Sequence, residues 1–343
     1  MMSTPTQAVE AIRRAQRPLT GFQALRAKVP PSLEVLVTCV IVALIGGLLF
    51  EGSMLFLLTT AVIYALFASA TNILFGWTGV SSFGQAAYFG VGAYTVGLTK
   101  DLIDNPIVAV LAGMIAAAAV AGLYALLASR ITGTEFAMLT LIFGQILWLL
   151  TFRIPELRGE NGIPAISRGE LFGVNLFPDQ AFWWYVVAIV TIALLVLRRI
   201  RGSSFGAAMN AVRDDPIRAE ALGISVRRVR FWAFVLAGAF AGLAGGLMAQ
   251  HQGLVTPEMI AWGLSGEVIV MCLIGGMRSF WGPAIGGILL VLIKHFLLDA
   301  TSAPDLWVGL ALLVIVLLLP GGLLSLPKKI SEALQRRKKE SSR

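Results

Sequence analysis

The sequence predicts an all-helical membrane protein that crosses the bilayer about ten times. Only 13% of its 343 residues are charged, whereas soluble domains carry about a quarter. The mean hydropathy is +0.82, and the apolar residues fall into ten runs. Each run is close to the ~20 residues that a helix needs to cross the hydrocarbon of a bilayer. These observations indicate an integral membrane protein rather than a soluble domain.

The ten apolar runs follow one another with mostly short connections. They cover residues 33–50, 53–75, 86–100, 106–128, 134–151, 181–198, 231–250, 260–277, 280–298 and 304–320. A basic tail precedes the first run, as in a secretory signal peptide, but the tail is long and a second run follows at once. The first run is therefore expected to stay in the protein as an uncleaved transmembrane helix.

The basic residues predict the orientation in the membrane and the domain boundaries. Five, eight and seven of the 27 Lys and Arg residues lie in a tail at 1–32, a loop at 198–230 and a tail at 327–343. With a cytoplasmic N-terminus, six runs precede the loop and ten precede the second tail, so all three segments face the cytoplasm, as the positive-inside rule requires. A transmembrane domain at 33–326 lies between the two tails. The net charge of +8 then reflects orientation and not nucleic-acid binding.

The 198–230 loop contains two short helical patterns. Phe205, Met209 and Val212 recur at i, i+4 and i+7, which places them on one helix face. The second pattern begins with Asp214-Asp215-Pro216, an Asp cap followed by a proline in the first turn, and ends at Gly223. A capped helix in a basic loop predicts a docking surface for a cytoplasmic partner. The alternative is a solvated loop whose arginines only orient the protein.

The stretch 76–97 is rich in glycine for a membrane span. It holds six glycines together with Ser81, Ser82 and Gln85, although each glycine costs a helix interior about 1 kcal/mol relative to Ala. The glycines suit either close packing of helices or a broken segment that lines a polar path. The candidate path residues here are Ser81, Ser82, Gly84 and Gln85. Small residues at 238–246 predict a second close helix contact.

Few ionisable residues lie within the predicted spans. They are Glu135, Glu267 and Lys294, and intramembrane charge is costly enough to indicate function by default. Glu135 lies at a span end, and Lys294 is expected to extend to the outer interface. Glu267 remains as a candidate for the polar path or a buried network. The sequence contains no GxxxxGK[ST], HExxH, GxSxG or CxxC motif, so neither a nucleotide site, a metal site nor a catalytic site is predicted.

Three segments together resemble a known family of transporters. They are TNILFGWTGVSSFGQAAYFGVGAYT at 71–95, AVRDDPIRAEALGISVRRVRFWAF at 211–234 and SGEVIVMCLIGGMRSFWGPAIGG at 265–287, with ENGI at 160–163. These segments are similar, in collinear order, to LivM-type permeases, the membrane subunits of branched-chain amino acid ABC importers. The resemblance runs from about residue 72 to 287, which is most of the chain.

The resemblance implies an ABC importer permease fold in a bacterial inner membrane, with both termini in the cytoplasm. It also implies a homologous, LivH-like second permease, two cytoplasmic ATPase subunits and a periplasmic substrate-binding protein. ATP and Mg²⁺ would be bound by the ATPases, so this chain would carry no cofactor and would not itself be an enzyme.

The capped helix would then be the coupling helix that contacts an ATPase. The residues expected to form this contact are Asp214, Asp215, Pro216, Ile217, Ala219, Glu220, Ala221 and Gly223. Importers of urea or short-chain amides share the permease architecture, so the cargo stays open between them and amino acids. A secondary transporter or a channel is also considered, but the sequence offers few coupling groups or pore-lining polar residues for either.

Overall fold

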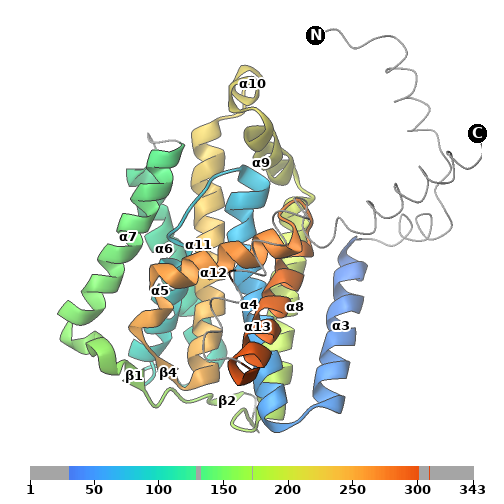
Figure 1. Ribbon diagram of the computed structural model, residues 1–343, viewed down its shortest axis with the longest axis vertical. Helices are drawn as coiled ribbons and strands as arrows, with labels where there is room; N and C mark the ends of the chain where they lie inside the picture. Colours follow the sequence, from blue (N-terminus) through green and yellow to red (C-terminus); the bar gives the residue numbers. More distant parts are fainter. Residues whose placement is uncertain (1–30, 129–132, 172, 301–308, 310–343) are drawn as a thin grey trace, which may run out of the picture.

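The computed structural model describes residues 31–128, 133–171, 173–300 and 309, and these form a bundle of helices standing side by side (Figure 1). The predicted tail at 327–343 and residues 1–30 of the predicted tail at 1–32 lie outside the described residues. The long helices are α3 (Pro31–Leu49), α4 (Gly52–Asn72), α6 (Pro106–Leu127), α7 (Thr134–Arg153), α8 (Asp179–Arg201) and α11 (Val226–Gln252). The other helices are η1 (Ile73–Thr78), α5 (Gln85–Leu98), η2 (Pro155–Leu157), η3 (Gly159–Asn161), α9 (Ser204–Asp214), α10 (Pro216–Ala221), η4 (Pro257–Met259), α12 (Trp262–Gly275) and α13 (Gly282–Ala300).

Six described helical segments are long and apolar enough to cross a membrane. They are Ser32–Leu49, Gly52–Thr78, Pro106–Leu127, Thr134–Arg153, Asp179–Arg201 and Val226–Gln252. The predicted spans at 86–100 and 260–277 instead form α5 and α12, of 14 residues each, and such helices are only about 21 Å long at 1.5 Å per residue. The predicted span at 304–320 lies outside the described residues except for residue 309. Ten crossings therefore stay a prediction.

Helix α11 lies at the centre of the bundle and packs against α4, α5 and α6. Its small residues permit this contact, because a Cβ at Gly245 would overlap the backbone carbonyl of Phe89 in α5. A Cβ at Gly242 or Gly238 would overlap the Cβ atoms of Ala117 or Ala121 in α6. The sequence prediction that 238–246 forms a close packing face is confirmed.

Four two-residue strands lie in the connections at the end of the bundle opposite α9 and α10 (Figure 1). Strand β1 (Ile163–Pro164) pairs antiparallel with β4 (Leu254–Val255), and β2 (Glu170–Leu171) pairs with β3 (Val174–Asn175). The all-helical prediction is correct for the bundle and missed these strands, which are too short to show an alternating pattern.

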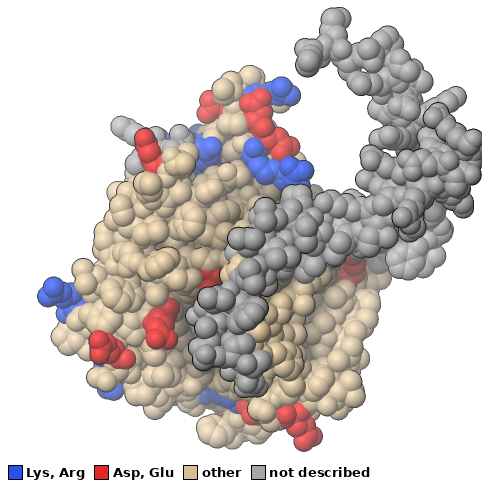
Figure 2. Space-filling view, viewed as in Figure 1, with Lys and Arg blue, Asp and Glu red and all other residues tan. Residues whose placement is uncertain are grey.

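The polar 198–230 loop folds as two helices at the opposite end. Figure 2 shows Lys, Arg, Asp and Glu side chains gathered around α9 and α10, above a flank with few charges. Met209 and Val212 are buried on the inner face of α9, as their spacing predicts. The loop is therefore an ordered knob that is anchored to the bundle.

Candidate functional site

Helix α10 has the start and stop signals that the sequence indicates. The Asp215 side chain accepts a hydrogen bond from the Arg218 backbone N–H at 3.0 Å, and Pro216 follows it in the first turn. Gly223 ends the helix with φ +82°, a left-handed conformation that costs glycine little. The Ile224 N–H donates back to the Ala219 carbonyl at 3.0 Å. These local bonds let a six-residue helix keep its shape outside the bundle.

The tip of α10 presents an apolar surface to its surroundings. Ile217 is 80% exposed and Leu222 is 74% exposed, and Ala221 is exposed beside them. Ala219 is buried, so this predicted coupling residue faces the body of the protein and not a partner. Leu222 was missed because it follows the last helical residue, and its exposure is not visible in a sequence pattern. We name Ile217, Ala221 and Leu222 the α10 tip.

Two arginines join α8 and α9 to other segments at this end of the bundle. Arg213 Nη1 donates to the Gly76 carbonyl in η1 at 2.6 Å, and Arg201 Nη2 donates to the Arg278 carbonyl at 2.6 Å. Gly76 itself packs on the Met277 carbonyl so closely that a Cβ would overlap it. The α10 knob is thus tied to the end of η1 and to the turn between α12 and α13.

Aromatic rings reinforce this connection. Trp77 of η1 and Phe280 of the turn stack with ring centroids 6.5 Å apart. The Arg198 guanidinium lies 5.0 Å from the Phe280 ring centroid, and that of Arg201 lies 5.5 Å from the Trp77 ring centroid. Cation–π contacts at this distance are attractive, so the two arginines hold η1 and the turn together.

Helix α5 begins inside the bundle, between α12 and α7. The Ala86 N–H at the start of α5 donates to Ser265 Oγ of α12 at 2.9 Å, and the Phe83 N–H donates to Thr140 Oγ1 of α7 at 2.9 Å. These hydroxyls satisfy backbone donors that a helix start leaves unpaired. The chain is not helical at 79–84, so the 76–97 stretch is broken there, and its glycines also pack closely. That this broken segment lines a polar path stays a prediction.

The predicted path residues lie in three environments. Ser82 and Gln85 are fully buried, with Gln85 Nε2 donating to Ser82 Oγ at 3.3 Å, and Gly84 packs on the Thr140 carbonyl. Ser81 instead lines a cavity of about 600 Å³ beside the knob, together with Gly79, Phe83, Glu220 and Arg230.

The third environment is an ion pair between α12 and α13. Glu267 Oε1 lies 2.6 Å from Lys294 Nζ. The sequence analysis expected Lys294 to extend to the outer interface and did not anticipate its partner, which in the structure is the half-buried carboxylate of Glu267. Glu267 and Lys294 are 27 residues apart in the sequence and lie on different helices. Hydrophobic periodicity alone does not show that these two side chains meet.

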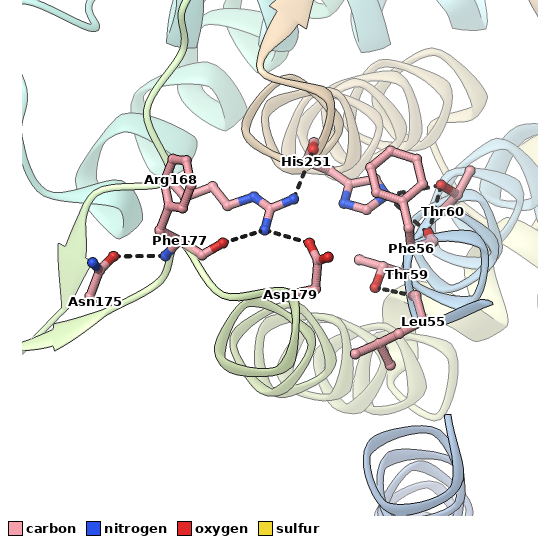
Figure 3. Close-up of polar contacts among 9 residues, drawn as sticks. All are labelled: Leu55, Phe56, Thr59, Thr60, Arg168, Asn175, Phe177, Asp179 and His251. Carbon is pink, nitrogen blue, oxygen red and sulfur yellow. Dashed lines mark hydrogen bonds and ion pairs between the residues drawn. The ribbon is translucent and has the colours of Figure 1, made fainter. Parts of the chain in front are cut away.

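At the end of the bundle that carries the short strands, Arg168 holds the connection between α7 and α8 in place (Figure 3). Its guanidinium donates to the Asp179 carboxylate at 2.7 Å, to the Phe177 carbonyl at 2.9 Å and to the His251 carbonyl at 3.3 Å. His251 Nε2 lies 3.0 Å from Thr60 Oγ1, and its ring stacks 4.0 Å from that of Phe56. This histidine, which the sequence left without a role, joins α11 to α4.

Comparison with known proteins identifies the family. Residues 53–319 match the family described as branched-chain amino acid transport system / permease component. The chain belongs to this family. It is 31% identical to the high-affinity branched-chain amino acid transport system permease protein LivM of Escherichia coli over 296 residues, which covers 79% of this chain and 69% of LivM.

The chain is also similar to a second branched-chain amino acid permease, LivH. The chain is 28% identical over 289 residues to the LivH permease of Salmonella typhimurium, which covers 77% of this chain and 92% of LivH. No solved structure gives a significant match. The chain is thus a multi-pass membrane permease. It is similar to two different permease proteins, LivM and LivH.

Proposed function

We propose that this chain is the permease subunit of an ABC importer that carries branched-chain amino acids across the bacterial inner membrane. The observation that carries the proposal is the capped, rigidly held α10 with its exposed apolar tip, in a permease that has no nucleotide-binding motif. ATP and Mg²⁺ are bound by two cytoplasmic ATPase subunits, which receive the α10 tip. A LivH-like permease and a periplasmic binding protein complete the importer.

The connections of α10 suggest how an ATPase moves the permease. Displacement of the knob pulls on Arg213 and Arg201, whose partners are carbonyls in η1 and in the turn after α12. These segments border the broken segment before α5 and the end of α12. Rigid-body motion of short helices around a site near the bilayer midplane is the general way in which such transporters alternate access.

The orientation and cargo are parts of the same proposal. The α10 end faces the cytoplasm, with both tails, 1–32 and 327–343, on that side of the domain at 33–326. Branched-chain amino acids are named for both LivM and LivH, which favours them over the urea and short-chain amides of the alternative importers. Uptake of radiolabelled leucine and of urea, each measured with the cognate binding protein, decides between these cargoes.

The experiment that tests the function replaces the exposed residues of the tip. Ile217→Ser and Leu222→Ser, alone and together, are produced with the ATPase subunits, and co-purification and leucine uptake into proteoliposomes are measured. Each buried Leu or Ile contributes about 1.5–3 kcal/mol, so the double variant should weaken ATPase association by roughly a hundredfold or more.

The matched control is Leu102→Ser, which changes an exposed leucine in the connection between α5 and α6. It should leave both association and uptake unchanged. Full ATPase binding together with full uptake in the double tip variant would show that α10 is not the docking helix.

A further inference from the structure

The cavity beside the α10 knob lies at one end of the bundle. Its walls come from the last residues of α6, the first residues of α7 and α11, the segment before α5 and one residue of α10. The α11 residues that line it run from Val226 to Phe234, which is about 12 Å along the helix at 1.5 Å per residue. The cavity therefore reaches from the α10 end into the membrane part of the bundle.

The lining has the composition of a small-molecule site. Such sites have volumes of roughly 300–1,000 Å³, mostly apolar and aromatic walls, and a few polar groups that orient the ligand. This cavity has a volume of about 600 Å³. The aromatic side chains of its described lining are Phe83, Phe136, Phe231 and Phe234. The walls therefore offer apolar contact to a side chain of a small ligand.

One guanidinium in the cavity wall lacks a partner. Arg230 Nε is buried and has no hydrogen-bond partner among the described residues, and an unpaired buried donor is destabilising. Arg227, one helical turn earlier, lines the same cavity. The two arginines favour an anionic group, and a carboxylate fits because it can accept two parallel N–H bonds from one guanidinium.

An acidic residue of α10 borders the same space. Glu220 is the acidic residue of the described lining, and among the described residues no ion pair joins it to Arg227 or Arg230. A purely anionic ligand would be attracted by the arginines but repelled by Glu220. Both signs of charge beside apolar walls instead suit a zwitterion with an apolar side chain.

The segment before α5 connects this cavity to the predicted path. Gly79, Val80, Ser81 and Phe83 line the cavity, and they belong to the stretch that is not helical between η1 and α5. Gly79 also packs on Arg213 of α9 so closely that a Cβ would overlap the arginine side chain. Both α10 and a segment in contact with α9 therefore form the cavity wall, so displacement of the knob changes its shape.

We propose that this cavity binds the transported amino acid on the cytoplasmic side, before its release. Arg230 binds the carboxylate, Glu220 binds the ammonium group, and the phenylalanines of the wall contact the branched side chain. The inference rests on the proposed function, which supplies an amino acid as the cargo and assigns the α10 end to the cytoplasm.

The test measures the binding of radiolabelled leucine to this chain, assembled with its second permease and its ATPases in lipid nanodiscs, without the periplasmic binding protein. The parent is expected to bind leucine saturably at millimolar concentration. Arg230→Gln should weaken this binding about ten- to hundredfold, the loss expected for a hydrogen bond between charged groups. Arg228→Gln is the matched control, because Arg228 is an exposed arginine of the same helix turn and does not line the cavity.

Two analogues of leucine separate the roles of the charged residues. Leucinamide lacks the carboxylate and isocaproate lacks the ammonium group, so both should compete poorly with leucine at the parent. Glu220→Gln should bind leucine and isocaproate with similar affinity, because the variant no longer recognises the ammonium group. Equal competition by leucinamide and leucine at the parent would contradict the role of Arg230.

A variant that fills the cavity tests the site without removing a charge. Ala137 of α7 lines the cavity, so Ala137→Phe should abolish leucine binding. Ala119→Phe is its control, since Ala119 is exposed on α6 and lies outside the cavity lining. Co-purification of the ATPases with each variant shows that the permease is still assembled.

Other results overturn the inference. Absence of saturable leucine binding by the parent, or unchanged affinity in both Arg230→Gln and Ala137→Phe, would show that the cavity does not hold the amino acid. A phospholipid that native mass spectrometry finds on the parent but not on Ala137→Phe, without leucine binding, would show a lipid in its place. Leucine uptake by the parent with its binding protein, measured on the same preparation, separates these results from failure of the proposed function.

Discussion

At Gly92 and Gly245 the absence of a side chain allows two helices to approach closely. Gly92 of α5 packs on the backbone of Gly242, and Gly245 of α11 packs on the Phe89 carbonyl. We expect Gly92→Ala and Gly245→Ala to destabilise the protein by about 1–3 kcal/mol each, because the added methyl group forces the helices apart. Thermal unfolding in detergent, followed by fluorescence-detected size exclusion, measures the loss.

The control for these glycines is Gly144→Ala in α7, where the nearest atom to the new Cβ is 3.9 Å away. This variant should be as stable as the parent or more stable, because Ala favours a helix over Gly by about 1 kcal/mol. Equal melting of Gly245→Ala and the parent would contradict the close contact between α5 and α11.

Helix α9 connects α10 to the membrane helices. Arg213→Ala removes the hydrogen bond to the Gly76 carbonyl, an interaction of a charged donor that contributes about 1.5–3 kcal/mol. We expect the variant to keep its ATPase subunits, because the α10 tip is unchanged, but to transport fewer amino acids per ATP hydrolysed. Uptake and phosphate release, measured on the same proteoliposomes, give this ratio.

Arg199→Ala is the matched control for this variant, since Arg199 is an exposed arginine at the end of α8. Its ratio of uptake to hydrolysis should equal that of the parent. If Arg213→Ala also keeps the parent ratio, α9 does not transmit motion through η1.

The whole molecule has two chemically different ends, with α9 and α10 at one and the strands at the other (Figure 1). We expect a cysteine introduced at Glu160 to react in intact cells with a membrane-impermeant maleimide, and one at Asp214 to react only after the membrane is opened. The native Cys39 and Cys272 are buried and provide a low background. Efficient labelling of Asp214→Cys in intact cells would reverse the proposed orientation.

The sequence by itself determined the membrane class and the capped α10, and six of its ten predicted runs coincide with long apolar helices. Hydropathy and caps act within one segment, so Asp215, Pro216 and Gly223 specify their helix without knowledge of the rest of the chain. The spacing of Met209 and Val212 likewise identified the buried face of α9 before any partner was known.

Only the tertiary structure decided where helices break and which groups pair. The start of α5 depends on the Ser265 hydroxyl, 179 residues away, and α9 depends on a carbonyl 137 residues from Arg213. The partner of Glu267 is Lys294, which the sequence had assigned to the interface. Such contacts depend on which faces of two helices meet, and no local periodicity or cap records that choice.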